Sequence, residues 1–430
     1  MRQKLRTTCP HRPAARIALA VLAVVVLASG AARSASDEMI AYDTEHYSIQ
    51  TDLTPRFATI VGNHMETIYR EYERRFEGYG KMTVRFDVRV FRTRDGYAQV
   101  VPKQYVGSTG IYIERGSKRL LAAHADGRTA EEVLRTLYHE GFHQFMYHVI
   151  SKRCPIWLNE GLAEYFSEAT WNGEGFETGI VPSSRLYKVQ EAVRNGAYIP
   201  LAVLFAMSSD EWARSAAMDA RRADLQYSQV WSVAQFLLHA DNGRYAHLIG
   251  KFLTELNETR DQVEAFTKVF GTDVGAFERA WALYTMNLKP SPKSVCRDNM
   301  QSLMLLAKLY YDRPAEFTSV GDLRKRVMGR RRYPWAITRP DGSKVSATDK
   351  DAVARLFHCP FDRTGHSASY VVARSPQTGE PVLVCMHHPG IIIKAYYQTD
   401  DRGQLQVVIE EEVHETVRQD LRQAIAAAMR

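Results

Sequence analysis

The stretch HEGFHQF, residues 139–145, contains two histidines four positions apart, with a glutamate directly after the first. In an α-helix, residues i and i+4 lie on one face, so His139 and His143 can reach a single tetrahedral ion about 2 Å from each ring. Glu140 would be too far round the helix for a good bond to that ion, but well placed to take a proton from a metal-bound water. Because H-E-x-x-H is a short pattern, it needs support from its surroundings.

The residues around this motif predict an amphipathic helix. TAEE, 129–132, fits a capping box, and the apolar residues that follow it recur at helical spacing. These residues are Leu134, Leu137, Tyr138, Phe142, Phe145 and Val149. Gly141 inside such a helix costs about 1 kcal/mol relative to alanine, and a close backbone approach near the site would explain it.

A second helix is predicted at PIWLNEGLAEYF, 155–166, where Pro155 suits the first helical position. Glu160 and Glu164 are again four positions apart and share one face. If the two helices pack antiparallel, Glu160 lies opposite the two histidines as a third metal ligand. Glu164 would then accept a hydrogen bond from the other ring nitrogen of a ligand histidine and orient that ring.

Together, HEGFHQF and WLNEGLAEYF resemble the gluzincin metallopeptidases, the thermolysin and aminopeptidase N type, and more closely the secreted peptidase-MA-like domains of bacteria. The resemblance implies that His139, His143 and Glu160 bind one Zn²⁺ per chain and that Glu140 is the catalytic base. Glu164 matches the family's acidic residue behind the ligands. One departure is that Glu160 follows His143 by 17 positions, a slightly shorter separation than in thermolysin or aminopeptidase N.

The resemblance covers roughly residues 40–290 and implies two further features. QYSQVWSVAQFLL, 226–238, is similar to a helix that carries an oxyanion-stabilising tyrosine in aminopeptidase-like relatives, which makes Tyr227 the candidate. The alternative is an ordinary tyrosine at a helix start. KRLLAAHA, 118–125, would be the strand at the rim of the cleft that binds substrate backbone, with His124 lining the cleft or simply exposed.

The remaining periodicity predicts an α+β fold. Strands are expected at 46–52, 83–91 and, as a pair, within 110–125, and a helix at 55–76. Further helices are expected at 94–101, 183–195, 225–240, 243–257, 259–269 and 273–286. Residues 37–290 would therefore form the HExxH metallopeptidase domain, with a small N-terminal sheet and a mostly helical C-terminal half.

The periodic pattern breaks at NLKPSPKSV, 287–295, which predicts a boundary before an accessory domain at 291–430. This small α+β domain is expected to contain a helix at 297–311, strands at 369–375, 380–386 and 391–398, and a final helix around 411–429. It is only faintly similar to the globular part of bacterial pseudopilins, and that likeness carries no function.

The cysteines of the C-terminal part favour a disulfide between Cys359 and Cys385, which lie in one compact stretch. Cys154–Cys296 is the weaker second pairing. The alternative is a second zinc site, which is disfavoured because the chain has no C-x-x-C pair. Its ligands would be Cys359, Cys385, His387 and His388.

Residues 1–36 have the layout of a secretory signal peptide: a basic start, an apolar run at 17–28, and small residues. The apolar run is short for a membrane span, which needs about 20 residues, so an uncleaved anchor is disfavoured. The chain carries a net charge of +7, but six basic residues and no acids lie within 1–36, which leaves about +1 for the rest. Charge therefore gives no reason to expect nucleic-acid binding.

These features predict a secreted or periplasmic zinc metallopeptidase that hydrolyses peptide bonds in peptides or proteins of the cell envelope. The alternative is a catalytically inactive, metallopeptidase-like module that binds the envelope. In either case the C-terminal domain is a candidate for contact with the envelope or cell wall. The sequence does not indicate an oligomeric state or a cleavage specificity.

Overall fold

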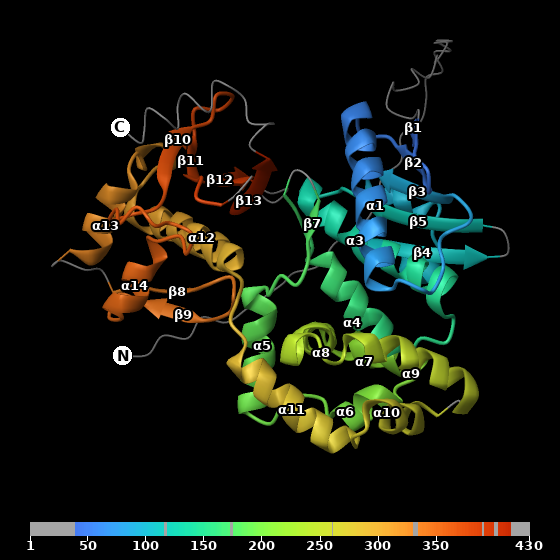
Figure 1. The fold of residues 1–430 in the computed structure, drawn as a ribbon. Helices are drawn as coiled ribbons and strands as arrows, with labels where there is room; N and C mark the ends of the chain where they lie inside the picture. Colours follow the sequence, from blue (N-terminus) through green and yellow to red (C-terminus); the bar gives the residue numbers. More distant parts are fainter. Residues whose placement is uncertain are drawn as a thin grey trace, which may run out of the picture. The chain divides into compact units, whose positions relative to one another are not determined.

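The computed structural model describes residues 39–115, 118–172, 175–259, 261–329, 334–388, 391–399 and 403–413 (Figure 1). The segment predicted to be a signal peptide lies outside these residues. From Met39 onward, the described residues belong to one compact unit. Among them, no helix combines the length and the apolar character that a membrane crossing requires.

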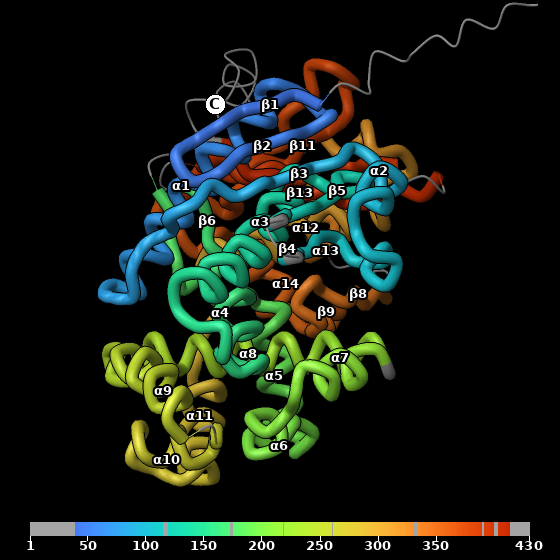
Figure 2. The backbone as a smooth tube through the Cα atoms, turned by 90° about the vertical axis from the view of Figure 1, so that its right-hand side faces the viewer, coloured from blue at the N-terminus to red at the C-terminus, as the bar shows by residue number. Residues whose placement is uncertain are grey.

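A five-stranded sheet begins the described chain, in the order β1-β2-β3-β5-β4 (Figure 2). Its strands are β1 (Ile40–Asp43), β2 (Tyr47–Thr51), β3 (Phe86–Phe91), β4 (Gly110–Arg115) and β5 (Lys118–His124). The three inner strands are parallel, and both edge strands run antiparallel to their neighbours.

The prediction that residues 118–125 form the strand at the rim of the cleft is wrong. These residues contain β5, which lies inside the sheet, whereas β4 forms the edge. The reason is the composition of β5. Leu121 and Ala123 face the main core, while Leu120 and Ala122 pack on the opposite face, so the strand is apolar on both sides, as an inner strand requires. His124 is likewise fully buried, against the Tyr97 ring, and neither lines a cleft nor is exposed.

Helices α1 and α3 pack against this sheet and against each other (Figure 1). Helix α1 (Pro55–Arg75) begins at Thr54, whose hydroxyl accepts the Phe57 N–H, and has proline in its first turn. A short helix, α2 (Arg94–Ala98), contributes Tyr97 to the cluster on the other face of the sheet.

The segment from 130 to 287 is mostly helical, as predicted. Its helices are α3 (Ala130–Phe145), α4 (Ile156–Ser167), α5 (Ser183–Arg194), α6 (Leu201–Ala206), α7 (Ser209–Met218), α8 (Ala220–His239), α9 (Ala246–Thr259), α10 (Gln262–Phe270) and α11 (Val274–Asn287). The sequence did not predict α6, α7 or the short hairpin of β6 (Thr170–Trp171) and β7 (Phe176–Glu177). The fold is therefore mixed α+β with small sheets, as expected.

Two glycines mark close contacts between these helices. A Cβ atom on Gly161 of α4 would lie 2.6 Å from the carbonyl oxygen of Val230 in α8, so the two helix backbones touch there. A Cβ atom on Gly141 of α3 would lie 2.8 Å from Cε of Met65 in α1. The Met65 side chain can move, whereas the Val230 backbone cannot move without shifting α8.

The C-terminal part has its own apolar core, which includes Cys296 and Ala395. Its elements are α12 (Pro292–Tyr310), α13 (Val320–Met328), β8 (Ala336–Thr338), β9 (Lys344–Ser346), α14 (Lys350–Leu356), β10 (Val371–Arg374), β11 (Pro381–Cys385), β12 (Ile391–Thr399) and β13 (Leu405–Val413). β10 to β13 form an antiparallel sheet in chain order. The boundary predicted near residue 290 falls between this core and the larger N-terminal one, and the exact division stays a prediction.

One expectation for the C-terminal part is wrong, and another lies mostly outside the described residues. The final helix expected around 411–429 lies outside them from residue 414 onward, and the residues up to Val413 belong to β13, which pairs with β12. Cys359 and Cys385 are free thiols and do not form the predicted disulfide. The partner of the Cys385 sulfur is Cys296, and that of the Cys359 sulfur is His388.

We expect Gly161→Ala to lower the free energy of unfolding by about 1–2 kcal/mol. Alanine gains about 1 kcal/mol of helix propensity, but a Cβ 2.6 Å from a backbone oxygen that cannot move lies in the upper half of the usual overpacking cost, about 2–3 kcal/mol. Urea unfolding measures the difference. Gly107→Ala is the matched control, because its Cβ would meet nothing within 4 Å. Equal stability of the two variants would contradict the close contact of α4 and α8.

Candidate metal centre

The candidate site is built on α3 and α4, which pack directly against each other. The predicted capping box starts α3: the Thr129 hydroxyl accepts the Glu132 N–H at 3.3 Å, and the Glu132 carboxylate accepts the Thr129 N–H at 2.8 Å. Pro155 caps the start of α4. These fixed starts set the phase of both helices, and therefore the direction in which their polar residues project.

The three predicted metal ligands come together in the structure. Nε2 of His139 and Nε2 of His143 are 3.0 Å apart. The Glu160 carboxylate oxygens lie 3.5 Å from Nε2 of His139 and 3.7 Å from Nε2 of His143. Tetrahedral zinc with bonds of about 2.0–2.1 Å separates its ligand atoms by about 3.3 Å, so this triangle has the size that one zinc ion requires.

Each histidine is held through its other ring nitrogen. Nδ1 of His143 is 3.1 Å from Oδ1 of Asn159, and Nδ1 of His139 is 3.5 Å from a carboxylate oxygen of Glu164, the residue predicted for this role. Both acceptors favour the tautomer with the proton on Nδ1, which leaves each Nε2 lone pair directed at the common centre. A cation between the two rings would relieve the repulsion of these lone pairs.

The charges around the site favour a cation. Burial disfavours a protonated His139, but its hydrogen bond to Glu160 and the charges of Glu164 and Glu140 outweigh burial and raise its pKa to about 9. Burial likewise opposes ionisation of Glu160, yet the two histidines lower the pKa of its carboxyl. The site is thus electronegative and stabilises positive charge at the point where the ligand atoms meet.

A series of partly buried ion pairs holds Glu164 on the side away from His139. Arg185 of α5 pairs with Glu164 and donates through Nε to Glu168 at 2.8 Å. Arg135 of α3 donates to the other oxygen of Glu168 at 2.6 Å and also pairs with Glu131 at 3.2 Å. Because each carboxylate has a guanidinium partner, the charges of the buried Glu164 and Glu168 are compensated and hold their positions.

Glu140, the predicted base, lies at the edge of the sheet. Its carboxylate accepts the backbone N–H of Tyr112 in β4 at 2.8 Å. Since β4 is the edge strand, this N–H points away from β5 and towards α3. The backbone of β4 therefore fixes the Glu140 carboxylate next to His139.

Tyr227, the predicted oxyanion donor, lies in the first half of α8 and is half-buried. Its hydroxyl accepts a hydrogen bond from Nε1 of Trp212 at 3.4 Å. Burial, followed by the negative charges of Glu160 and Glu164, raises its pKa. The phenol is therefore a neutral hydrogen-bond donor, close enough to the site to sense its carboxylates.

Sequence reasoning missed several residues that position the site. Asn159 precedes Glu160 in the NEG segment, so its role as the partner of His143 could have been inferred from the family-like motif. Arg185 lies in a different helix with no spacing signal that links it to Glu164. The Tyr112 N–H is a backbone group, and its contact with Glu140 depends on which strand forms the sheet edge.

Comparison with protein families gives a match over part of the chain. Residues 133–256 match the sequence model of a family described as a protein of unknown function (DUF1570). No curated protein matches this chain. The matched segment contains the three candidate ligands together with Glu140 and Tyr227, and ends before the C-terminal cysteines.

We expect Glu164→Gln to weaken zinc binding by about 10- to 100-fold while leaving the fold intact. An uncharged acceptor would support the His139 ring less well, and such supporting groups typically contribute this much to metal affinity. Competition with a chromophoric chelator measures the affinity. Glu191→Gln on the exposed face of α5 is the matched control. An unchanged affinity in Glu164→Gln would contradict the supporting role.

Proposed function

We propose that this protein is a zinc-dependent peptidase that hydrolyses peptide bonds in peptides or proteins of the cell envelope. The observation that supports this most directly is the convergence of His139, His143 and Glu160 with a carboxylate, Glu140, at their side. The envelope location rests on the N-terminal sequence. The family match describes no activity and leaves the reaction to be argued from the site.

The chemistry divides between the metal and the protein groups around it. Zinc bound at this site would supply a Lewis acid that polarises the scissile carbonyl and lowers the pKa of water towards about 7. Glu140 would accept a proton from the attacking water and later deliver it to the leaving amine. Its hydrogen bond to the Tyr112 N–H keeps the carboxylate in one orientation through both transfers. The neutral Tyr227 hydroxyl would donate a hydrogen bond to the oxyanion.

The edge strand β4 suggests how a substrate is aligned. It is an edge strand, and an extended peptide could add to the sheet beside it through outward backbone groups other than the Tyr112 N–H. Because the outward N–H of Tyr112 already bonds Glu140, such a peptide would run directly past the proposed base. The proposed arrangement favours recognition of substrate backbone over recognition of one particular side chain.

We expect Glu140→Gln to abolish peptide hydrolysis, with a loss of about 10²–10⁴-fold, while zinc binding is retained. The amide cannot act as a base but preserves size and leaves the three ligands unchanged. The zinc-loaded wild type and the variant are incubated with an unfolded-protein digest, and new peptide termini are identified by mass spectrometry. Glu191→Gln serves as the control.

The same experiment tests the alternative of an inactive envelope-binding module. New termini that appear with the wild type but not with Glu140→Gln would establish the peptidase. If the zinc-loaded wild type produced no new termini, or if Glu140→Gln produced as many, the proposed hydrolysis through Glu140 would be rejected.

We expect Tyr227→Phe to lower kcat by about 10²-fold with little change in KM. The hydroxyl would act only on the charge that develops in the transition state, so its loss should leave substrate binding nearly unchanged. Steady-state kinetics on a peptide identified in the digest separates the two constants. Tyr245→Phe, on a tyrosine packed among phenylalanines, is the matched control. A change in KM alone would assign Tyr227 to substrate binding.

A further inference from the structure

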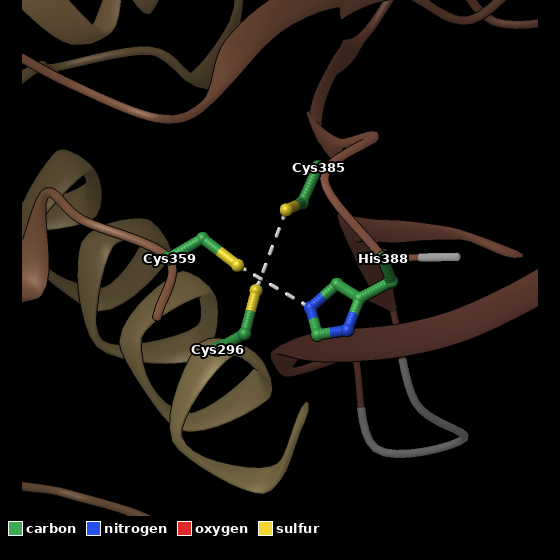
Figure 3. A group of neighbouring side chains, drawn as sticks. All are labelled: Cys296, Cys359, Cys385 and His388. Atoms are coloured by element: carbon green, nitrogen blue, oxygen red, sulfur yellow. Dashed lines mark hydrogen bonds between the residues drawn. The ribbon is translucent and has the colours of Figure 1, made fainter. Parts of the chain in front are cut away.

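The core of the C-terminal part contains three cysteines and a histidine whose side chains converge (Figure 3). They come from three separate segments of the chain. Cys296 lies in α12, Cys359 follows α14, Cys385 ends β11, and His388 lies in the turn after β11. All four are almost completely buried, with exposed fractions of 0–3%.

The distances in this cluster fit a tetrahedral metal ion. Sγ of Cys296 and Sγ of Cys385 are 3.5 Å apart, Sγ of Cys359 is 3.3 Å from Nε2 of His388, and all four ligand atoms lie within 4.8 Å of one another. With Zn–S bonds of about 2.3 Å and Zn–N bonds of about 2.0 Å, neighbouring ligand atoms lie about 3.5–3.8 Å apart. Three thiolates and one imidazole form a donor set common in structural zinc sites.

Other polar groups point at the sulfur atoms. The backbone N–H of Phe361 donates to the Cys359 sulfur, and the backbone N–H of His387 donates to the Cys385 sulfur. In both cases the donor lies two residues after the cysteine. The buried Tyr370 hydroxyl lies beside Cys296 and can donate to its sulfur. Donors arranged in this way stabilise thiolate ligands in a dry interior.

The neighbouring histidine, His387, makes its polar contacts outside the cluster. Nε2 of His387 is 2.9 Å from the carbonyl oxygen of Ser369 and 3.5 Å from the Asp362 carboxylate. His388 instead turns its Nε2 to the sulfur of Cys359. The two adjacent histidines therefore have different roles, and His387 offers a matched control for its neighbour.

We propose that Cys296, Cys359, Cys385 and His388 bind a structural zinc ion, separate from the His139 centre. Four protein ligands in a closed, buried shell leave no position for substrate or water, which is the arrangement of structural rather than catalytic zinc. The ion joins α12 to one end of the β10–β13 sheet and to the loop after α14. It raises the expected zinc content from one ion to two per chain.

The first test is the metal content and spectrum of the full-length chain. We expect about two zinc ions per chain in the wild type, and about one in each of Cys359→Ser, His388→Ala and His143→Ala. Cobalt replacement should give sulfur-to-cobalt charge-transfer absorption that His143→Ala retains and Cys359→Ser loses. Cys154→Ser and His387→Gln should retain both ions and the full absorption.

A second measurement on the wild type alone covers the case in which the ligand variants fail to fold. With zinc bound, the three clustered thiols should resist a thiol reagent, and a strong chelator should make them reactive. Peptide mapping that finds a disulfide between Cys296 and Cys385 in folded, metal-free protein would overturn the proposal. A folded His143→Ala chain without metal would overturn it as well.

The two proposals can fail separately. Charge-transfer absorption in a wild type that releases no new peptide termini would support the structural site and reject the peptidase. Hydrolysis by a wild type with about one zinc ion per chain, lost in His143→Ala, would support the peptidase and reject the structural site.

Discussion

The contact between the backbones of α4 and α8 at Gly161 is the constraint on which the candidate site depends. With no side chain between them, α8 approaches α4 closely enough to bring Tyr227 near Glu160, and α4 also packs against α3, which carries the histidines. Helix α4 is therefore held between two partners, and its rotation is fixed from both sides. A glutamate on a helix fixed in this way can meet two imidazoles at metal-ligand distance without help from a loop.

Charge compensation behind the ligands is the second constraint. Glu164 would be costly to bury alone, but Arg185, Glu168 and Arg135 form an alternating series that pairs each charge. The series continues from Arg135 through Glu131 to Arg297 in α12, 3.0 Å away. The carboxylate that orients His139 is thus part of one ion-pair network with the C-terminal part, which gives the accessory segment a physical connection to the site.

The sequence predicted what local spacing determines. His139, His143, Glu160 and Glu164 followed from the i, i+4 geometry of two adjacent helices, and the capping box located the start of the first. Prediction from the sequence failed where the structure depends on contacts between residues far apart in the chain. Which strand forms the sheet edge is decided by contacts with β3, and the partner of the Cys385 sulfur is Cys296 in α12, 89 positions away. The disulfide between Cys359 and Cys385 was predicted from their proximity along the chain. The same reliance on proximity missed Arg185, which lies in a different helix from Glu164.

The two clusters of ligand atoms differ in the way that separates catalytic from structural metal sites. The N/O ligands of the α3–α4 site keep side-chain exposures of 13–16% and supply three donors, so an ion bound there would keep a fourth position open. The sulfur-rich cluster supplies four donors at 0–3% exposure, so nothing can enter. Ligand number and burial, more than ligand identity, therefore support the proposed reaction at the first site and the proposed structural role of the second. The N-terminal helices have a large core to hold the first site in place, whereas the small C-terminal sheet has far less apolar area and more need of a cross-link.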